Sequence, residues 1–420
     1  MRKYINDALK ILSKVLVEGA YSNMALNGER VSDMTTRLVY GTLENNVKIE
    51  YILSTLVSKK PQTAVYTLLK IGTYALLNLD DVPHFAIVSE CVEVAKMNGK
   101  GGASGFVNAV LKKIANGAYE LPTQGDGNYL SVTYSKPQWF VNKLVKQYGV
   151  DVATKVLSEP SHTLEHVRVN SRLATQNDIE KLFAKSKTPY QKSEVGGYIV
   201  RVNDAVKREF DKGLITYQSP SSMLAVKALQ VSDNSQILDV CSAPGGKAIY
   251  MSELNPHGKI TACDLHEHRV RLIQKYKNRM HTPNVRAQVA DATVLNNEWI
   301  DCFDFVLCDA PCSCFGTFTK HPDVFLSKDE KDIYDIAKMQ AIILETCSQY
   351  LKKGGAMVYS TCTLFKEENQ DIVNAFLAKH PDFYLEEIKI DGICQNDGTL
   401  QILPHDYFDG FFIARLRRAK

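Results

Sequence analysis

A regular alternation of short apolar runs and helical lengths, which begins at residue 236, constrains the fold more than any other feature of the sequence. Each run has the length of a buried strand, and each intervening stretch is long enough for a crossover helix. Such a rhythm is typical of a parallel sheet covered by helices, so we predict a doubly wound α/β domain. The expected strands are 236–240, 259–264, 285–291, 304–310 and 355–361, with a last strand at 410–418.

The first 116 residues have a different pattern, in which apolar residues recur at helical spacing and strand patterns are nearly absent. In 4–16, for example, Ile5, Leu9 and Leu12 share one stripe of a helix. Turn-forming residues then fill 121–128, which predicts the end of an all-helical domain. Further helices are expected at 35–47, 63–79, 85–97 and 105–115.

The segment between these two regions mixes one helical pattern, at 136–149, with two short strand patterns, at 166–171 and 197–202. Residues 131–220 contain 14 basic and nine acidic side chains, which makes this the most basic part of the chain. A basic surplus favours contact with a polyanion, although a solvated basic surface gives the same count. We predict a helical domain at 1–128, a small mixed α/β segment at 129–218 and the main α/β domain at 219–420.

The ten cysteines are expected to be free thiols rather than disulfides. The first residues carry charges where a signal peptide would have its apolar core, and no apolar run approaches the roughly 20 residues that cross a bilayer. We therefore expect a cytoplasmic protein without a membrane segment, in a compartment that keeps thiols reduced.

The ends of the expected parallel strands carry the pattern of a nucleoside site. The first strand ends in the turn DVCSAPGGKA (239–248), whose glycines allow close approach of the backbone to a ligand. Three later strands end at Asp264, Asp291 and Asp309, and an acidic residue about 20 positions after such a turn suits a ribose. Neither GxGxxG nor GxxxxGK[ST] is present, which disfavours a dinucleotide or phosphoryl transfer. S-adenosylmethionine, which has ribose hydroxyls and no pyrophosphate, fits this pattern best.

Two cysteines follow expected strand ends and are candidates for catalysis. Cys312 and Cys314 have no CxxC or HxxxH partner to complete a metal set, so we predict no metal site. A thiolate that adds to carbon 6 of cytosine makes carbon 5 nucleophilic enough to accept a methyl group. Cys312, in DAPC, and Cys362, in STCTLFKEEN, could each attack, and spacing does not decide between them. Analogy with DNA cytosine methylases, which use a Pro-Cys pair, favours Cys312.

Several longer stretches resemble the Sun/NOL1/NOP2 family of RNA cytosine-C5 methyltransferases. In the main domain these are ILDVCSAPGGK (237–247), DAPCSCFGTFTKHPD (309–323), YSTCTLFKEEN (359–369) and DGFFIARL (409–416). The front of the chain, including 29–45, 68–96 and 105–114, resembles the NusB-like helical domain that precedes the catalytic domain in a bacterial 16S rRNA enzyme of this family. The resemblance implies a Rossmann-like methyltransferase domain and covers nearly the whole chain.

The resemblance also implies a role for particular residues. Cys362 would be the nucleophile, Cys312 would assist release of the product, and Asp309 would contact the cofactor or the target base. Cys308 and Cys314 have no family role and are interpreted as packing thiols. The family usually has Ala at the position of Ser242. The implied S-adenosylmethionine site comprises Cys241, Ser242, Ala243, Pro244, Gly245, Gly246, Lys247, Asp264, Asp291 and Asp309.

The resemblance implies 16S rRNA, free or in an early small-subunit particle, as the substrate of a monomeric enzyme. The target carbon is inaccessible in a stacked helix, so the nucleotide must be flipped out or unpaired. Candidate RNA contacts are Lys320, His321, Arg168 and Arg172. The same chemistry on tRNA or 23S rRNA, and an RNA-binding assembly factor that has lost turnover, are the alternatives.

Overall fold

The computed structural model describes residues 1–19, 22–26, 31–161, 164–390, 393–395 and 397–420. By compactness the chain divides into two units, each of which includes a segment that is distant in sequence. Unit 1 comprises Met1–Ser158 and His321–Asp329, and unit 2 comprises Glu159–Lys320 and Glu330–Lys420. The domain boundaries predicted at 128 and 218 stay predictions.

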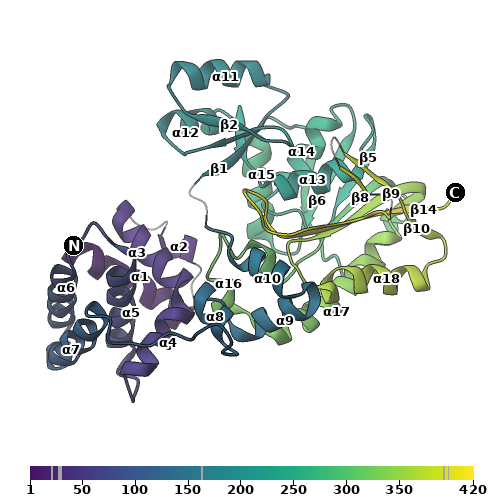
Figure 1. The fold of residues 1–420 in the computed structure, drawn as a ribbon. Coiled ribbons are helices and arrows are strands. Elements are labelled where there is room, and N and C mark those ends of the chain that lie inside the picture. The colour runs from purple at the N-terminus through teal and green to yellow at the C-terminus, as the bar shows by residue number, and fades with distance from the viewer. Residues whose placement is uncertain (20–21, 27–30, 162–163, 391–392, 396) are drawn as a thin grey trace. The chain divides into compact units, whose positions relative to one another are not determined.

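Unit 1 is helical, as the apolar spacing predicts (Figure 1). The stripe of Ile5, Leu9 and Leu12 is buried in a core shared with the other early helices, and Ser32 caps α3 by accepting a hydrogen bond from the Thr35 amide. The helices are α1 (Arg2–Glu18), α2 (Ser22–Leu26), α3 (Asp33–Glu44), α4 (Asn46–Leu56), α5 (Thr63–Asn78), α6 (His84–Met97), α7 (Ser104–Ala115), α8 (Tyr129–Tyr134), α9 (Gln138–Tyr148), α10 (Val150–Leu157) and α16 (Val324–Ser327).

Unit 2 begins with a small four-stranded antiparallel sheet in the order β2-β3-β1-β4. The two strands predicted at 166–171 and 197–202 are β1 and β3, whereas β2 and β4 were not predicted. The elements are β1 (Glu165–Val169), α11 (Gln176–Lys185), β2 (Tyr190–Lys192), β3 (Tyr198–Val200), α12 (Asp204–Asp211) and β4 (Ile215–Tyr217).

The main sheet of unit 2 has the order β10-β14-β9-β8-β5-β6-β7, with β13 paired to β14. All five predicted parallel strands are present, and they run from β9 to β7. The predicted last strand, β14, lies antiparallel to β9. The strands are β5 (Gln236–Asp239), β6 (Lys259–Asp264), β7 (Val285–Val289), β8 (Phe303–Asp309), β9 (Leu351–Thr361), β10 (Phe383–Leu385), β13 (Thr399–Ile402) and β14 (Phe411–Arg418), beside a separate pair of β11 (Ile388–Ile390) and β12 (Ile393–Gln395).

Successive residues of the main strands point to opposite faces, and each face is covered by helices (Figure 1). Ile237 packs in the core that contains α13 (Pro220–Leu229), α14 (Gly246–Leu254) and α15 (Glu267–Arg279). Leu238 packs in the opposite core, with α17 (Glu330–Ser348) and α18 (Gln370–Lys379). The predicted doubly wound α/β class is therefore confirmed. Among the helices that the structure describes, none has the length and apolar character needed to cross a lipid bilayer.

Candidate active site

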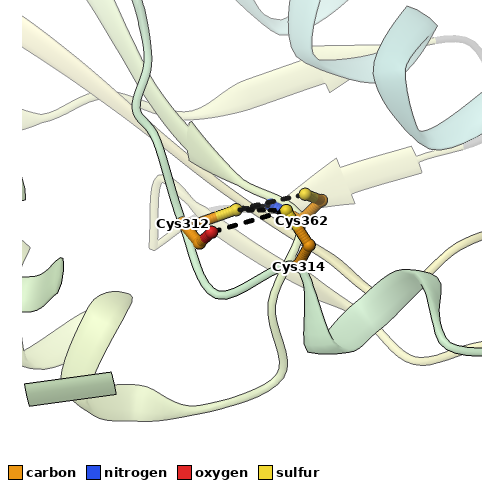
Figure 2. A group of neighbouring side chains, drawn as sticks. All are labelled: Cys312, Cys314 and Cys362. Atoms are coloured by element: carbon orange, nitrogen blue, oxygen red, sulfur yellow. Dashed lines mark hydrogen bonds between the residues drawn. The ribbon is translucent and has the colours of Figure 1, made fainter. Parts of the chain in front are cut away.

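Two neighbouring parallel strands bring Cys312 and Cys362 together. Asp309 at the end of β8 pairs in register with Ser360 of β9, so the loops that follow both strands leave the same edge of the sheet. The Sγ atoms of Cys312 and Cys362 lie 3.1 Å apart, and the Cys362 amide donates a hydrogen bond to Cys312 Sγ at 3.3 Å (Figure 2). The two thiols are 50 residues apart in the sequence, and the pairing of β8 with β9 brings them together in the fold.

Cys314 completes a group of three thiols (Figure 2). Its backbone has a φ of 63°, in the left-handed region, and its Sγ lies 3.9 Å from that of Cys312. Cys314 is half-buried, so the interpretation as a packing thiol does not describe its position. Cys308, in contrast, is fully buried in the core of the sheet, as expected of a packing thiol.

A buried glutamate holds the two cysteine loops in place. Glu368 accepts hydrogen bonds from the amide and the hydroxyl of Ser313, at 2.8 and 2.5 Å, and from Gln340 Nε2 at 3.1 Å. The Ser313 hydroxyl also lies 2.8 Å from the Thr363 hydroxyl, which links the residue after Cys312 to the residue after Cys362. Burial raises the pKa of Glu368, and the hydrogen bonds from Ser313 partly counteract this effect.

The crowding of the thiols makes them hard to ionise. Hydrogen bonding with Cys314 and Cys362, followed by burial, raises the pKa of Cys312. The hydrogen bond with Cys312 lowers the pKa of Cys362, but contact with Cys314 and burial outweigh it, and the net pKa is raised. Thiolate formation is therefore favoured at only one sulfur at a time, because a second negative charge would lie close to the first.

Charged side chains lie beside the thiols at the ends of β5 and β8. Lys247 Nζ lies 2.7 Å from Asp309 Oδ2, and Ser360 donates to Asp309 Oδ1 at 2.8 Å. Burial lowers the pKa of Lys247, but the Asp309 carboxylate more than offsets it, so the pKa is raised and the ammonium stays charged. Asp239 is fully buried, and desolvation together with the Asp309 charge raises its pKa to about 7.

The turn after β5 has the conformation of a ligand cradle. The Ala243–Pro244 peptide is cis, and Gly245 has a φ of 112°, which favours glycine. Helix α14 starts at Gly246, so its free amides face the end of the sheet. Arg269 donates to the Ala243 carbonyl at 3.2 Å and also lies 3.2 Å from Asp264 Oδ2, which ties the turn to the end of β6.

A pocket opens next to this turn, beyond the ends of β5, β6 and β7. Val240, Cys263 and Val289 form part of its apolar lining, and Asp291 and Trp299 also border it. The Asp291 carboxylate accepts hydrogen bonds from Thr293, which lower its pKa and keep it ionised. An apolar pocket with carboxylates at its rim fits the adenosine part of S-adenosylmethionine, because carboxylates accept hydrogen bonds from hydroxyl and amino groups.

Comparison with known protein families matches two parts of the chain. Residues 226–417 match the model described as 16S rRNA methyltransferase RsmB/F, and residues 6–116 match the NusB family. A relative from Bacillus subtilis (strain 168), named "Probable ribosomal RNA small subunit methyltransferase B", is 35% identical over 98% of this chain and 98% of its own. The chain belongs to the RsmB/F family.

Two further comparisons agree with this assignment. The ribosomal RNA small subunit methyltransferase B of Photorhabdus laumondii subsp. laumondii is 29% identical over 91% of this chain and 89% of its own. The crystal structure of PH0851 has the same fold, with a TM-score of 0.84 at 23% identity over 100% of this chain and 99% of the other. As an RsmB/F protein the chain is an S-adenosylmethionine-dependent methyltransferase, which confirms the predicted enzyme class and cofactor.

One predicted RNA contact of this RsmB/F protein is wrong. Arg168 is 3% exposed, and its guanidinium pairs with the buried Glu253 and donates to Gln218 Oε1 at 2.6 Å. A phosphate would have to displace this ion pair from the interior, at a large cost in free energy. Arg172 is half-buried and donates at 2.8 Å both to the Ser252 carbonyl and to Asn284 Oδ1.

The other two candidates lie in different compact units. Lys320, in unit 2, forms an ion pair with Asp409 at 2.9 Å and keeps 28% of its side chain exposed. His321, in unit 1, is exposed. Both stay candidates for RNA contact.

Sequence reasoning missed Asp239 and Glu368, which are fully buried and lie next to the predicted site. Both occur within stretches that carry the family resemblance, Asp239 in DVCSAPGG and Glu368 in FKEEN. Asp239 ends an apolar strand at the same edge of the sheet as Asp264, and this position is the signal that could have identified it. Glu368 sits among charged neighbours in the sequence, so nothing there distinguishes it from a solvated side chain.

Proposed function

We propose that this chain transfers a methyl group from S-adenosylmethionine to carbon 5 of a cytosine in small-subunit ribosomal RNA, with Cys362 as nucleophile. The observation that carries the proposal is the meeting of two thiols at 3.1 Å beside the cofactor turn. An enzyme that forms and then breaks a bond to carbon 6 needs a nucleophile and a nearby base, and two adjacent sulfurs supply both.

In the first step the Cys362 thiolate forms a bond to carbon 6 of the cytosine, and carbon 5 becomes nucleophilic. S-adenosylmethionine, which residues 241–247 with Asp264 and Asp291 would hold, would supply the methyl group and leave as S-adenosylhomocysteine. Lys247 and Asp309 lie close enough to Cys362 to influence its charge, and the Asp309 side chain is a candidate to bind the base or the cofactor. The positive charge of Lys247 favours the thiolate form of Cys362.

In the second step carbon 5 must lose its proton so that the bond between carbon 6 and Cys362 can break. Cys312 Sγ lies 3.1 Å from Cys362 Sγ, and as a thiolate it would accept this proton. The Cys362 amide hydrogen bond to Cys312 Sγ stabilises that thiolate. Elimination then restores the free thiolate of Cys362 and releases the methylated RNA. Cys312 passes the proton to solvent.

The names of the relatives support a small-subunit rRNA substrate. We propose that this RNA is methylated either free or within an early particle. We place the enzyme in the cytoplasm as a monomer, where its thiols stay reduced. Lys320, His321 and Arg172 are the remaining proposed RNA contacts.

A denaturing gel of protein incubated with 16S rRNA and S-adenosylmethionine tests the two cysteine roles. Cys312→Ala should stay covalently joined to RNA, because the adduct forms and is not released, whereas Cys362→Ala should be inactive and unjoined. Cys302→Ala is the matched control, since this exposed thiol precedes β8 at the opposite end from Cys312, and it should behave as wild type. The reverse pattern would exchange the two roles, and absence of methyl transfer by wild type on all RNA tested would refute the proposed function.

A further inference from the structure

The three thiols of the active site are arranged in a way that methyl transfer does not require. Two sulfurs suffice for attack and release, yet a third, from Cys314, lies 3.9 Å from Cys312 Sγ. The Sγ atoms of Cys312, Cys314 and Cys362 all lie within 4.8 Å of one another. The left-handed backbone at Cys314 turns its side chain back over Cys312, and its thiol donates to the Cys312 carbonyl at 3.4 Å.

These separations match the ligand spacing of a tetrahedral thiolate site. Zinc–sulfur bonds of about 2.3 Å at tetrahedral angles place neighbouring sulfurs about 3.8 Å apart. The Sγ–Sγ separations of 3.1 Å for Cys312–Cys362 and 3.9 Å for Cys312–Cys314 lie on either side of that value. Because all three Sγ atoms already lie within 4.8 Å of one another, the proposed site needs only side-chain adjustments to bring them to one ion.

The surroundings also suit a cation held by thiolates. A metal ion deprotonates coordinating thiols, so three sulfurs around a divalent ion carry a net charge of minus one. The Lys247 side chain, which forms an ion pair with Asp309 at 2.7 Å on the strand that pairs with the one before Cys362, supplies a positive charge that would offset this negative charge. Cys314 and Cys362 are half-buried rather than sealed in the core, which gives an ion and one water ligand access from solvent.

We propose that Cys312, Cys314 and Cys362 form a three-thiolate site for one thiophilic divalent cation such as Zn²⁺, with water as fourth ligand. Binding releases the thiol protons to solvent and involves no oxidation. The prediction of no metal site rests on the spacing of Cys312 and Cys314 along the chain. Cys362 lies 50 residues from Cys312 in the sequence, so spacing alone does not reveal it as a third ligand. An occupied site would hold both catalytic sulfurs and stop methyl transfer; this consequence, unlike the binding itself, rests on the proposed function.

Titration of the reduced, metal-free protein with Co²⁺ tests the site directly. Wild type should bind one equivalent and show the intense charge-transfer and ligand-field absorption of a tetrahedral cobalt thiolate, which Zn²⁺ then abolishes. Loss of an outer-shell partner already weakens metal binding 10–100-fold, so loss of a ligand in Cys314→Ala should weaken it by more than about 100-fold. Cys314→Ser, which is nearly isosteric, should do the same, and Cys302→Ala should bind as wild type. Equal cobalt affinity in wild type and both Cys314 variants, or no tetrahedral spectrum, would overturn the proposal.

Methyl transfer provides a second readout. Metal-free Cys314→Ala should transfer methyl groups and resist Zn²⁺ at concentrations that stop the wild type, and a chelator should restore the wild type. If wild type binds cobalt but the metal-free enzyme transfers no methyl group, the metal site stands and the proposed function fails. If the metal-free enzyme is active and binds neither cation, the proposed function stands and the metal site fails.

Discussion

Asp239 gives a prediction whose size follows from the structure. Its side chain is fully buried at the end of β5, and burial together with the Asp309 charge raises its pKa to about 7. In the unfolded chain an aspartate titrates near 3.9. The folded protein therefore binds this proton more tightly than the unfolded chain, so the free energy of unfolding falls as the pH rises from about 4 to about 7.

The expected loss is about 1.4 kcal/mol per pH unit, or about 4 kcal/mol in total, and it stops above pH 7 because both states are then ionised. Asp239→Asn removes the titration. The difference in unfolding free energy between variant and wild type should therefore grow by about 4 kcal/mol between pH 4 and pH 7, in favour of the variant. This growth is independent of how well the new amide fits, since an amide does not titrate and any misfit adds the same amount at every pH.

Urea unfolding in a Trp139→Phe background measures this effect in unit 2 alone. The sequence has two tryptophans, and the remaining one, Trp299, packs in unit 2 against Tyr350 and Phe303. Asp291→Asn is the control: hydrogen bonds from Thr293 lower the pKa of Asp291, so its contribution changes mainly below about pH 4, and the stability curves of this variant and its parent should be nearly parallel between pH 4 and pH 7. Parallel stability curves for Asp239→Asn and its parent between pH 4 and pH 7 would refute the assigned ionisation.

Three more predictions concern the cysteine loops. Glu368→Ala should reduce methyl transfer at least tenfold, because it removes three hydrogen bonds that hold the cysteine loops. The affinity for S-adenosylmethionine, measured by calorimetry, should change little. An equal loss of methyl transfer and of this affinity would contradict the prediction. Gly316→Ala should destabilise unit 2 by several kcal/mol in urea, since its Cβ would lie 2.0 Å from the Gly410 carbonyl oxygen, whereas Gly105→Ala, with open space, should be neutral or stabilising. Because the pKa of Cys362 is raised, kcat/KM should rise with pH above neutrality; a flat profile over pH 7–9 would exclude thiolate formation as the limiting ionisation.

The sequence predicted the order of the main elements well because their periodicity is strong. The helix expected at 35–47, however, runs across the break at Asn45 between α3 and α4. The central parallel strands β5, β8 and β9 are largely buried, so each forms an apolar run, and the early helices have regular stripes; the edge strand β7 is only partly buried. The strands that sequence reasoning missed are short: β2, β4 and β10 have three residues each. Pairing with neighbours, rather than their own composition, makes these segments strands.

Site residues could be predicted where the signal is local in the sequence, and they were misjudged where it depends on residues distant in the sequence. Cys312 and Cys362 could be identified because each follows a recognisable strand, and parallel strands end at one edge. Arg168 was misassigned because sequence shows a basic residue in a basic segment, whereas the buried carboxylate of Glu253, 85 positions away, decides where its charge is satisfied. The same reasoning applies to the thiols: spacing along the chain excluded a metal, and the register between β8 and β9 supplied the third sulfur. A cluster assembled across strands therefore has to be judged from which loops leave the same edge of the sheet, because in a parallel sheet the loops after all the strands do so.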